Sequence, residues 1–326
     1  MINFEEAPDS QKKAKLDHLP DYLTTLNSKQ FEASTTVEGP LIVLAGAGSG
    51  KTKMLTSRVA FLIDRCGVPS HQVMAVTFTN KAAAEMKERV QRALKGIVAT
   101  PEIGTFHSFC LRILRRELGR LPFTQAFVIF DDSDQLSLVK NVMGQLQIDT
   151  KTFSPKSFQA AINQAKCEAV MPEDYEPAAF SSFEKHFQKF YFQYQKELFK
   201  NNALDFGEII CMTYRLLRDH ADVRSYYQNR FRYIHVDEYQ DTNRAQYLLL
   251  SMLAAPQYGG HSNLCVVGDE DQSIYAWRGA DIRNILDFEN DFPGASVVKL
   301  EQNYRSTKTI VAASSQLIKN NTQRKD

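Results

Sequence analysis

The sequence predicts an α/β fold in which a parallel β-sheet carries an inserted helical domain. Residues 41–44 (LIVL) are a continuous apolar run that ends in a glycine-rich turn, which is typical of a buried parallel strand. Further strand patterns at residues 73–78 and 103–106 alternate with helical patterns at 50–66 and 79–94. This alternation indicates a parallel sheet covered by helices.

The second half of the chain indicates how this sheet continues. From about residue 111 to about 200 the pattern is helical, and strand patterns return at 232–236, 264–267 and 296–300. We therefore predict four parts, which are a polar leader at 1–20, a sheet domain at 21–110 and 201–290, a helical insertion at 111–200, and the start of a second sheet domain at 291–326.

The composition narrows the class of protein. The 326 residues carry a formal net charge of +1, so a nucleic-acid site has to be built from local groups. The five cysteines form no C-x-x-C pair, which argues against a zinc site or a disulfide framework. The first thirty residues contain no apolar signal core, and no stretch approaches a membrane span, so we expect a soluble, cytoplasmic protein without membrane contact. One helical segment carries a run of arginines that we interpret as a solvated face rather than a duplex contact, namely Arg112, Arg115, Arg116 and Arg120.

Residues 45–52 (AGAGSGKT) match the phosphate-binding pattern G-x-x-x-x-G-K-[ST], except that Ala45 replaces the first glycine. Small residues let backbone N–H groups turn inward around an anion, and the following helix adds its positive N-terminal end. Lys51 would reach the β- and γ-phosphates of ATP, and the Thr52 hydroxyl would bind Mg²⁺. The strand before and the helix after this segment argue against the alternative, an incidental glycine-rich turn.

An acidic pair follows the strand pattern at 232–236. Asp237 would bind Mg²⁺, and Glu238 would orient and deprotonate the attacking water. The alternative is a solvated acidic turn. A third polar segment, residues 268–272, follows another strand, and Gln272 has the donor and acceptor needed to contact a γ-phosphate and a water together. From these residues alone, a surface loop explains the third segment about as well.

Taken together, the ordered motifs resemble the N-terminal portion of the UvrD/Rep/PcrA group of superfamily 1A DNA helicases, meaning domains 1A and 1B and the start of 2A, with a RecA-like P-loop NTPase sheet. The resemblance covers about residues 22–318. Besides the phosphate loop, it rests on residues 26–30 (LNSKQ), 77–83 (TFTNKAA), 104–107 (GTFH), 237–241 (DEYQD), 268–275 (GDEDQSIY), 277–280 (WRGA) and 302–306 (QNYRS).

The resemblance implies roles for individual residues. The catalytic residues would be Lys51, Asp237, Glu238, Gln272 and Arg305. The residues that contact ATP would be Gln30, Ala45, Gly46, Ala47, Gly48, Ser49, Gly50, Lys51, Thr52, Arg58, Tyr304 and Arg305, with Gln30 at the adenine edge and Tyr304 stacked on its ring. Single-stranded DNA would contact Phe78, Asn80, Thr105, His107, Tyr275 and Trp277. Without the resemblance, Phe78 is better explained as a core residue, and a core position explains Trp277 about as well as a surface position does.

The implied activity is an ATP-dependent 3′–5′ DNA helicase or translocase that acts on single-stranded and duplex DNA as a monomer. Family members are about twice as long and carry a second RecA-like domain with a further catalytic arginine. We therefore expect this chain to bind ATP and single-stranded DNA, to hydrolyse ATP slowly and not to unwind DNA alone. Three alternatives stay open, which are a non-motor ATP- and DNA-binding module, a P-loop ATPase unrelated to nucleic acid, and the helicase half of a helicase-nuclease.

Overall fold

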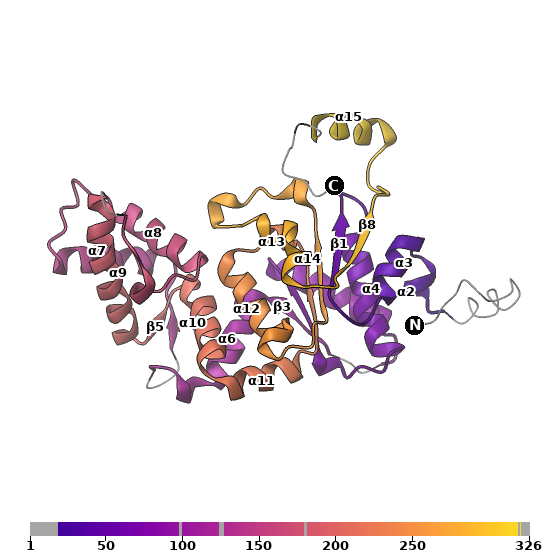
Figure 1. Ribbon diagram of the computed structural model, residues 1–326, viewed down its shortest axis with the longest axis horizontal. Coiled ribbons are helices and arrows are strands. Elements are labelled where there is room, and N and C mark those ends of the chain that lie inside the picture. Colours follow the sequence, from indigo (N-terminus) through magenta and orange to yellow (C-terminus); the bar gives the residue numbers. More distant parts are fainter. Residues whose placement is uncertain (1–18, 98–99, 124–126, 179–180, 319, 321–326) are drawn as a thin grey trace, which may run out of the picture.

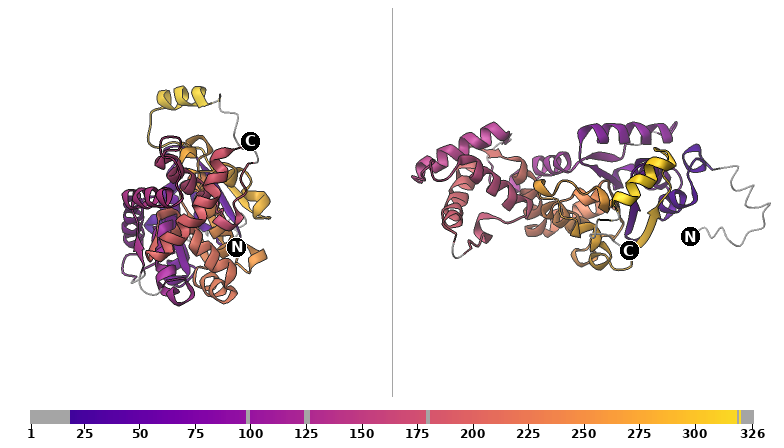
Figure 2. Two further views of the ribbon diagram at one scale, coloured as in Figure 1. Left: turned by 90° about the vertical axis from the view of Figure 1, so that its left-hand side faces the viewer. Right: turned by 90° about the horizontal axis from the view of Figure 1, so that it is seen from above.

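The computed structural model describes residues 19–97, 100–123, 127–178, 181–318 and 320 (Figure 1). A sheet with its covering helices forms one side of an elongated molecule, and a helical part forms the other (Figures 1 and 2). The predicted polar leader at 1–20 lies almost wholly outside the described residues.

Six parallel strands form the main sheet, in the order β3-β2-β6-β7-β1-β8. Leu44 at the end of β1 pairs with Gly268 of β7, and Val76 near the end of β2 pairs with Val236 of β6. The loops that follow these strands therefore emerge at one sheet edge, where ligands of parallel α/β sheets bind. The strands are β1 (Leu41–Ala45), β2 (Val73–Thr77), β3 (Glu102–Thr105), β6 (Tyr233–Val236), β7 (Leu264–Gly268) and β8 (Ser296–Leu300).

Apolar side chains bury both faces of this sheet, which accounts for the near-continuous apolar strands. One face packs against α3 (Ser28–Thr35), α4 (Lys51–Asp64) and α5 (Asn80–Ala93), with Met54, Val59 and Met86 in the core. The other packs mainly against α6 (Phe106–Arg116), α10 (Phe206–Asp219), α11 (Ala221–Arg230) and α12 (Arg244–Ala254). Three short helices complete this part, namely α2 (Asp21–Thr24), α13 (Arg283–Leu286) and α14 (Phe288–Asp291).

The helical part has a hydrophobic core of its own. It consists of α7 (Asp132–Gln145), α8 (Pro155–Cys167) and α9 (Ser182–Lys200), and a two-stranded parallel ladder closes it, formed by β4 (Val128–Ile129) and β5 (Ala203–Leu204). An aromatic stack along α9, including Phe187, Phe190 and Tyr194, fills this core. α10 starts directly after β5 and returns the chain to the sheet.

The strand at 296–300 differs from the prediction, which assigned it to the start of a second sheet domain. β8 instead pairs in parallel with β1, from Leu41↔Ser296 to Ala45↔Leu300. The reason is its apolar face, because Val298 and Leu300 are buried in the same core as β1, whereas the alternate residues are exposed. α15 (Lys308–Ile318) follows, stands away from the sheet in Figures 1 and 2, and has no buried residue among its described positions.

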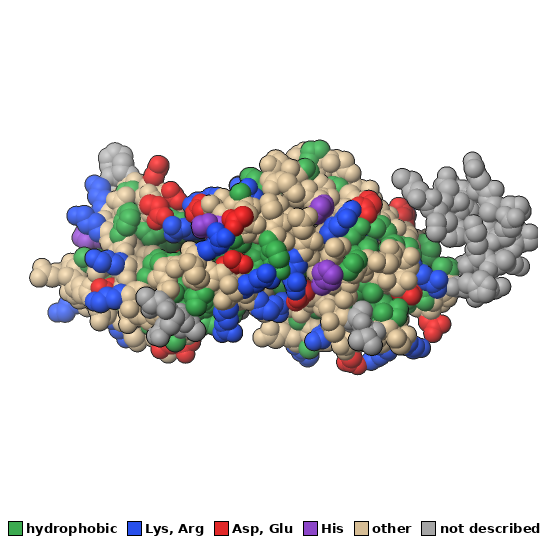
Figure 3. Space-filling view, turned by 90° about the horizontal axis from the view of Figure 1, so that it is seen from below, with side chains coloured by type: hydrophobic (Ala, Val, Ile, Leu, Met, Phe, Trp, Pro, Cys, Tyr) green, Lys and Arg blue, Asp and Glu red, His purple; other side chains and the backbone are tan. Residues whose placement is uncertain are grey.

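Two features of the surface bear on function. Within the described ranges, no helix combines the length and apolar character needed to cross a membrane. Lys and Arg side chains gather near the middle of the lower face (Figure 3), in the region of α6 and α11. There Arg112 pairs with Glu102 at 3.0 Å, and the Arg116 guanidinium lies 4.1 Å from the centre of the Tyr226 ring. This pairing supports the solvated-face interpretation of the arginine run.

Candidate active site and adjoining pocket

The glycine-rich loop at residues 46–50 joins β1 to α4 at the ligand-binding edge of the sheet. Gly48 and Gly50 have φ angles of 72° and 84°, the left-handed region that disfavours other residues. A Cβ at Gly50 would lie 2.6 Å from Gln30 Nε2, and one at Gly48 would lie 2.7 Å from Arg305 Cβ. The loop is therefore held between α3 on one side and the turn at 303–306 on the other.

That turn makes direct hydrogen bonds to the loop. Asn303 Nδ2 donates to the Ala47 carbonyl at 2.6 Å, and the Tyr304 N–H donates to the Gly48 carbonyl at 2.8 Å. Both hydrogen bonds use carbonyl groups of the loop as acceptors, so the turn at 303–306 holds the loop without occupying the N–H groups of the loop.

An ion pair connects the end of the glycine-rich loop to the acidic pair that follows β6. Lys51 is the first residue of α4, and its Nζ lies 3.1 Å from Glu238 Oε2. The Lys51 side chain is 11% exposed and that of Glu238 is 40% exposed. Glu238 follows β6 with a φ of 50°, an uncommon left-handed conformation that turns the chain sharply after the strand. The structure thus brings together two residues that lie far apart in the sequence.

Three carboxylates crowd the loop after β6. Burial and, after it, the Glu238 carboxylate raise the pKa of Asp237 to about 6, against the opposing charge of Lys51. Burial, and then Glu238, also raise the pKa of Asp241 to about 6. The site therefore favours an added positive charge.

The donors available for Mg²⁺ are hard oxygens. Among the described residues, no group of three or more His, Cys, Asp or Glu side chains is arranged to hold a metal ion. Mg²⁺ is commonly held by one or two protein oxygens together with phosphate oxygens and water. The Asp237 carboxylate and the Thr52 hydroxyl fit that requirement.

Of the residues predicted to contact the adenine, Gln30 is buried and Tyr304 is exposed. Gln30 is 2% exposed, and its amide accepts from the Asn27 N–H at 3.1 Å and donates to the Ser49 carbonyl at 2.7 Å. Gln30 therefore connects α3 to the phosphate loop. Tyr304 is exposed beside it, and its hydroxyl accepts from Asn27 Nδ2 at 2.7 Å.

The prediction that Arg58 contacts the nucleotide is not consistent with its position. Arg58 is 1% exposed, and its guanidinium donates to backbone carbonyls at the end of α3, those of Ala33 at 3.0 Å, Val37 at 3.2 Å and Thr36. It satisfies carbonyl groups that a helix end leaves without partners. We assign it a structural role in holding α3 against α4.

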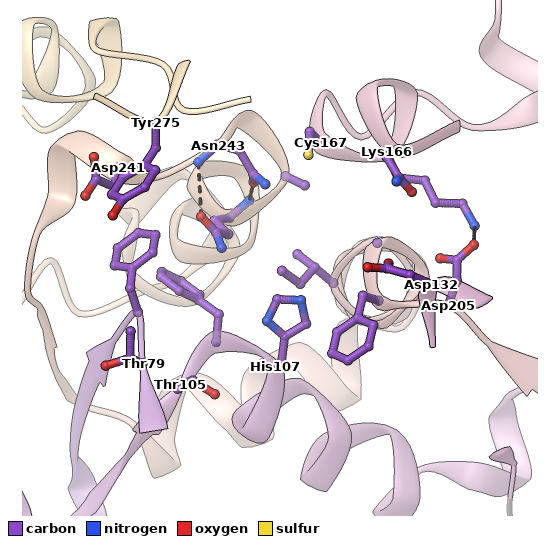
Figure 4. A pocket seen from close by; sticks show the side chains of 18 of the residues that line it. Thr79, Thr105, His107, Asp132, Lys166, Cys167, Asp205, Asp241, Asn243 and Tyr275 are labelled. Carbon is purple, nitrogen blue, oxygen red and sulfur yellow. Dashed lines mark hydrogen bonds and ion pairs between the residues drawn. The ribbon is translucent and has the colours of Figure 1, made fainter. Parts of the chain in front are cut away.

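A pocket of about 360 Å³ lies beside the acidic loop, between the sheet and the helical part (Figure 4). The loop after β2 and the junction of β3 with α6 form one wall with Phe78, Thr105 and His107, and Tyr275 belongs to a second wall. The opposite side comes from α8 and the start of α10, and it includes Lys166, Cys167, Asp205 and Phe206.

Aromatic rings are prominent in this pocket. Phe78 meets Phe106 edge-on with centroids 6.0 Å apart, and His107 meets Phe206 at 5.7 Å. Burial lowers the pKa of His107, so its ring is neutral at pH 7. Phe206 is 52% exposed although phenylalanine is usually buried.

The other residues predicted to contact DNA lie near the pocket or at its edge. Thr105 caps α6 by accepting from the Ser108 N–H, and it also lines the pocket. Trp277 is 73% exposed, with its ring 6.3 Å from that of Tyr275. Asn80 is exposed at the start of α5 and is not among the residues that line the pocket.

Sequence reasoning missed Phe206 and Asp241 as site residues. Phe206 gave no separate signal, because a phenylalanine that opens an amphipathic helix is ordinarily a core residue. Asp241 stood inside a quoted motif, but only the fold brings it to the pocket beside Tyr275 (Figure 4).

The parallel sheet, the glycine-rich loop after β1 and the acidic pair after β6 define a RecA-like P-loop nucleotide-binding domain. Residues 26–293 match the family model described as the UvrD/REP helicase N-terminal domain, and the chain belongs to this family.

Two bacterial helicases are similar to this chain over most of its length. The chain is 50% identical over 303 residues to the ATP-dependent DNA helicase PcrA of Staphylococcus aureus, covering 93% of this chain and 41% of that protein. It is likewise 50% identical over 303 residues to PcrA of Bacillus subtilis, covering 93% of this chain and 40% of the relative. The chain thus spans about two fifths of the length of these relatives.

Proposed function

We propose that this chain binds ATP with Mg²⁺ at residues 45–52 and single-stranded DNA in the adjoining pocket, as the N-terminal part of an ATP-dependent DNA helicase or translocase. The observation that most directly supports this function is the 3.1 Å contact between Lys51 Nζ and Glu238 Oε2, at the same sheet edge as the aromatic pocket. Both relatives named above are called ATP-dependent DNA helicases. Because the chain spans about 41% of their length, strand separation is proposed only for a full-length protein.

In the proposed chemistry, Lys51 exchanges partners when ATP binds. Without nucleotide, its charge is balanced by Glu238. The β- and γ-phosphates are stronger anionic partners, so Lys51 would turn to them and leave the Glu238 carboxylate available to accept a proton from the attacking water.

Asp237 and Thr52 would hold Mg²⁺, which neutralises developing phosphate charge when bound. Arg305 and Gln272 would contact the γ-phosphate side of the nucleotide. Arg305 lies in the turn that packs on Gly48, which is consistent with this role.

The adenine site would use Tyr304 and Gln30. Tyr304 offers an exposed ring face for stacking. A glutamine amide has two donors and two acceptor positions, so the contacts of Gln30 to Asn27 and Ser49 leave one of each for an adenine edge.

Single-stranded DNA would lie along the aromatic pocket, with bases stacked on Phe78, Phe206, Tyr275 and Trp277. Stacking on aromatic faces tolerates any base, which suits a motor that moves along DNA of any sequence. His107 and Thr105 would hydrogen-bond to sugar or phosphate, whereas Asn80 would contact the strand only outside the pocket.

The remaining parts of the proposal concern the whole protein. The segment at 111–200 would be an inserted domain, and a second RecA-like domain would close on the nucleotide. The 3′–5′ direction and the monomeric state are proposed from the family resemblance, and the cytoplasmic location is proposed from the cysteine pattern.

The test is ATP binding and turnover by the purified chain, beside Lys51→Ala and Glu238→Gln. We expect Lys51→Ala to weaken ATP binding by at least about tenfold, because the phosphates lose a charged partner. Glu238→Gln should keep the binding and reduce turnover by about 100-fold or more, since it removes the general base.

We also expect slow turnover in the unmodified chain, because an arginine supplied by a second lobe is typically worth about 10³–10⁵ in rate. Unchanged ATP affinity in Lys51→Ala would overturn the proposed nucleotide site. Robust strand separation by this chain would contradict the requirement for a second lobe.

A further inference from the structure

Gln240 is a buried amide located between the nucleotide site and the pocket. It is 1% exposed and lies in the short turn that follows Glu238. Its Nε2 donates to Glu238 Oε2 at 2.9 Å, the same oxygen that contacts Lys51. Its Oε1 accepts from the Asp269 N–H at 3.0 Å, at the start of the loop after β7. A single side chain therefore bonds to the proposed general base, Glu238, on one side and to the loop after β7 on the other.

The loop after β7 extends this contact toward the aromatic residues. The Asp269 carboxylate accepts from the Asp271 N–H at 3.1 Å and from the Gln272 amide. The Ser273 hydroxyl donates to the Gln240 backbone carbonyl at 3.4 Å. Two residues further on, Tyr275 lines the pocket.

The space around Gln240 leaves its amide few alternatives. A Cβ at Gly268 would lie 2.7 Å from Gln240 Oε1 and 2.8 Å from Ile285 Cδ1, so glycine at this position allows the amide to approach the strand. Because both ends of the amide are bonded and the side chain is buried, a movement of Glu238 has to be transmitted to Asp269 or break a hydrogen bond.

We propose that Gln240 is a positioning residue that couples the nucleotide site to the DNA pocket. The inference rests on the proposed function. When Lys51 turns to the phosphates, Glu238 loses one of its two contacts, and Gln240 passes the resulting shift to the loop that carries Tyr275 and Trp277. The same amide holds the Glu238 carboxylate in place for proton transfer.

The fluorescence of Trp277 provides a direct readout, because it is the only tryptophan of the chain and is 73% exposed. The experiment titrates the chain with a non-hydrolysable ATP analogue and Mg²⁺ and records Trp277 emission and analogue affinity in parallel. We expect a saturable emission change in the unmodified chain. In Gln240→Met, which keeps the side-chain length without the amide, the change should fall at least about fivefold while the analogue affinity stays within about threefold.

Two further variants separate coupling from folding. Gln228 is also buried, and its amide donates to the Met252 and Tyr258 carbonyls at 2.8 Å each, away from the site. Gln228→Met therefore loses comparable hydrogen bonds and should keep the full emission change. Gly268→Ala displaces the Gln240 amide without removing it, and it should reproduce the loss even if Gln240→Met does not fold.

The outcomes distinguish this inference from the proposed function. A full emission change in folded Gln240→Met or Gly268→Ala overturns the coupling role of Gln240. An equal loss in Gln228→Met also overturns it, because a general loosening would then explain the effect. Analogue binding that is insensitive to Lys51→Ala would instead indicate that the proposed nucleotide site is wrong.

Discussion

Replacing Lys166 by methionine should destabilise the junction between the helical part and the sheet part. Lys166 Nζ lies 2.7 Å from Asp205 Oδ2 and 3.1 Å from Glu208 Oε2, and the exposed fractions of the three side chains are 0%, 2% and 0%. Methionine matches the lysine stem in length but leaves two buried carboxylates without a cation. Removing one partner of a buried ion pair costs about 3–5 kcal/mol in the free energy of unfolding.

The two carboxylates should not contribute equally to this cost. Asp205 keeps hydrogen bonds from the Tyr194 hydroxyl at 2.7 Å and the Glu208 N–H at 2.8 Å, which caps α10. Glu208 is held mainly by its ion pair with Lys166, and burial raises the pKa of its carboxyl group. Most of the loss in Lys166→Met therefore comes from Glu208.

Urea unfolding followed by circular dichroism measures these effects. We expect Lys166→Met to lose about 3–5 kcal/mol, and the double variant Lys166→Met/Glu208→Gln to recover a large share of it. Glu208→Gln alone should change stability by about 1 kcal/mol or less, because the neutral amide needs no counter-charge and Lys166 keeps Asp205 as its partner. A loss below about 1 kcal/mol in Lys166→Met, or no recovery in the double variant, would refute the argument.

Two further predictions concern the pocket. Burial holds the pKa of His107 below its ordinary value of 6.5, so the unfolded chain binds this proton more readily. Stability should therefore fall as the pH drops below about 6.5, by up to about 1.4 kcal/mol per pH unit. His107→Gln should show a smaller loss between pH 7.5 and 5.5 in urea unfolding, and an identical pH dependence would contradict this. Phe206→Ala should weaken binding of an oligothymidine by about 1–3 kcal/mol, because stacking on an exposed ring is lost. The same substitution should change the free energy of unfolding by only about 0.5 kcal/mol. Unchanged affinity in an anisotropy titration would exclude Phe206 from the DNA site.

The sheet was predictable because its strands are apolar and end in recognisable loops. Residues 41–45 and 264–268 are buried throughout or nearly so, and such runs have few other stable arrangements. The meeting of Lys51 and Glu238 followed from the rule that loops after parallel strands share one edge.

Other features depend on packing that no local pattern contains. The alternating residues of β8 predict a strand with one buried face, but they do not say which sheet it joins. Arg58 has the sequence character of a surface arginine, and only the position of the end of α3 explains its burial. Phe206 is the reverse case, because its exposure depends on how the helical part meets the sheet.

The central claim is that the glycine-rich loop and the aromatic pocket work as one connected nucleotide and DNA site. The most direct test is the affinity of the chain for a fluorescent oligothymidine, measured with and without a saturating non-hydrolysable ATP analogue and Mg²⁺, in the unmodified chain and in Lys51→Ala. We predict that the analogue shifts the affinity at least about fivefold in the unmodified chain and leaves it unchanged in Lys51→Ala. Equal affinity with and without the analogue in the unmodified chain would contradict the account.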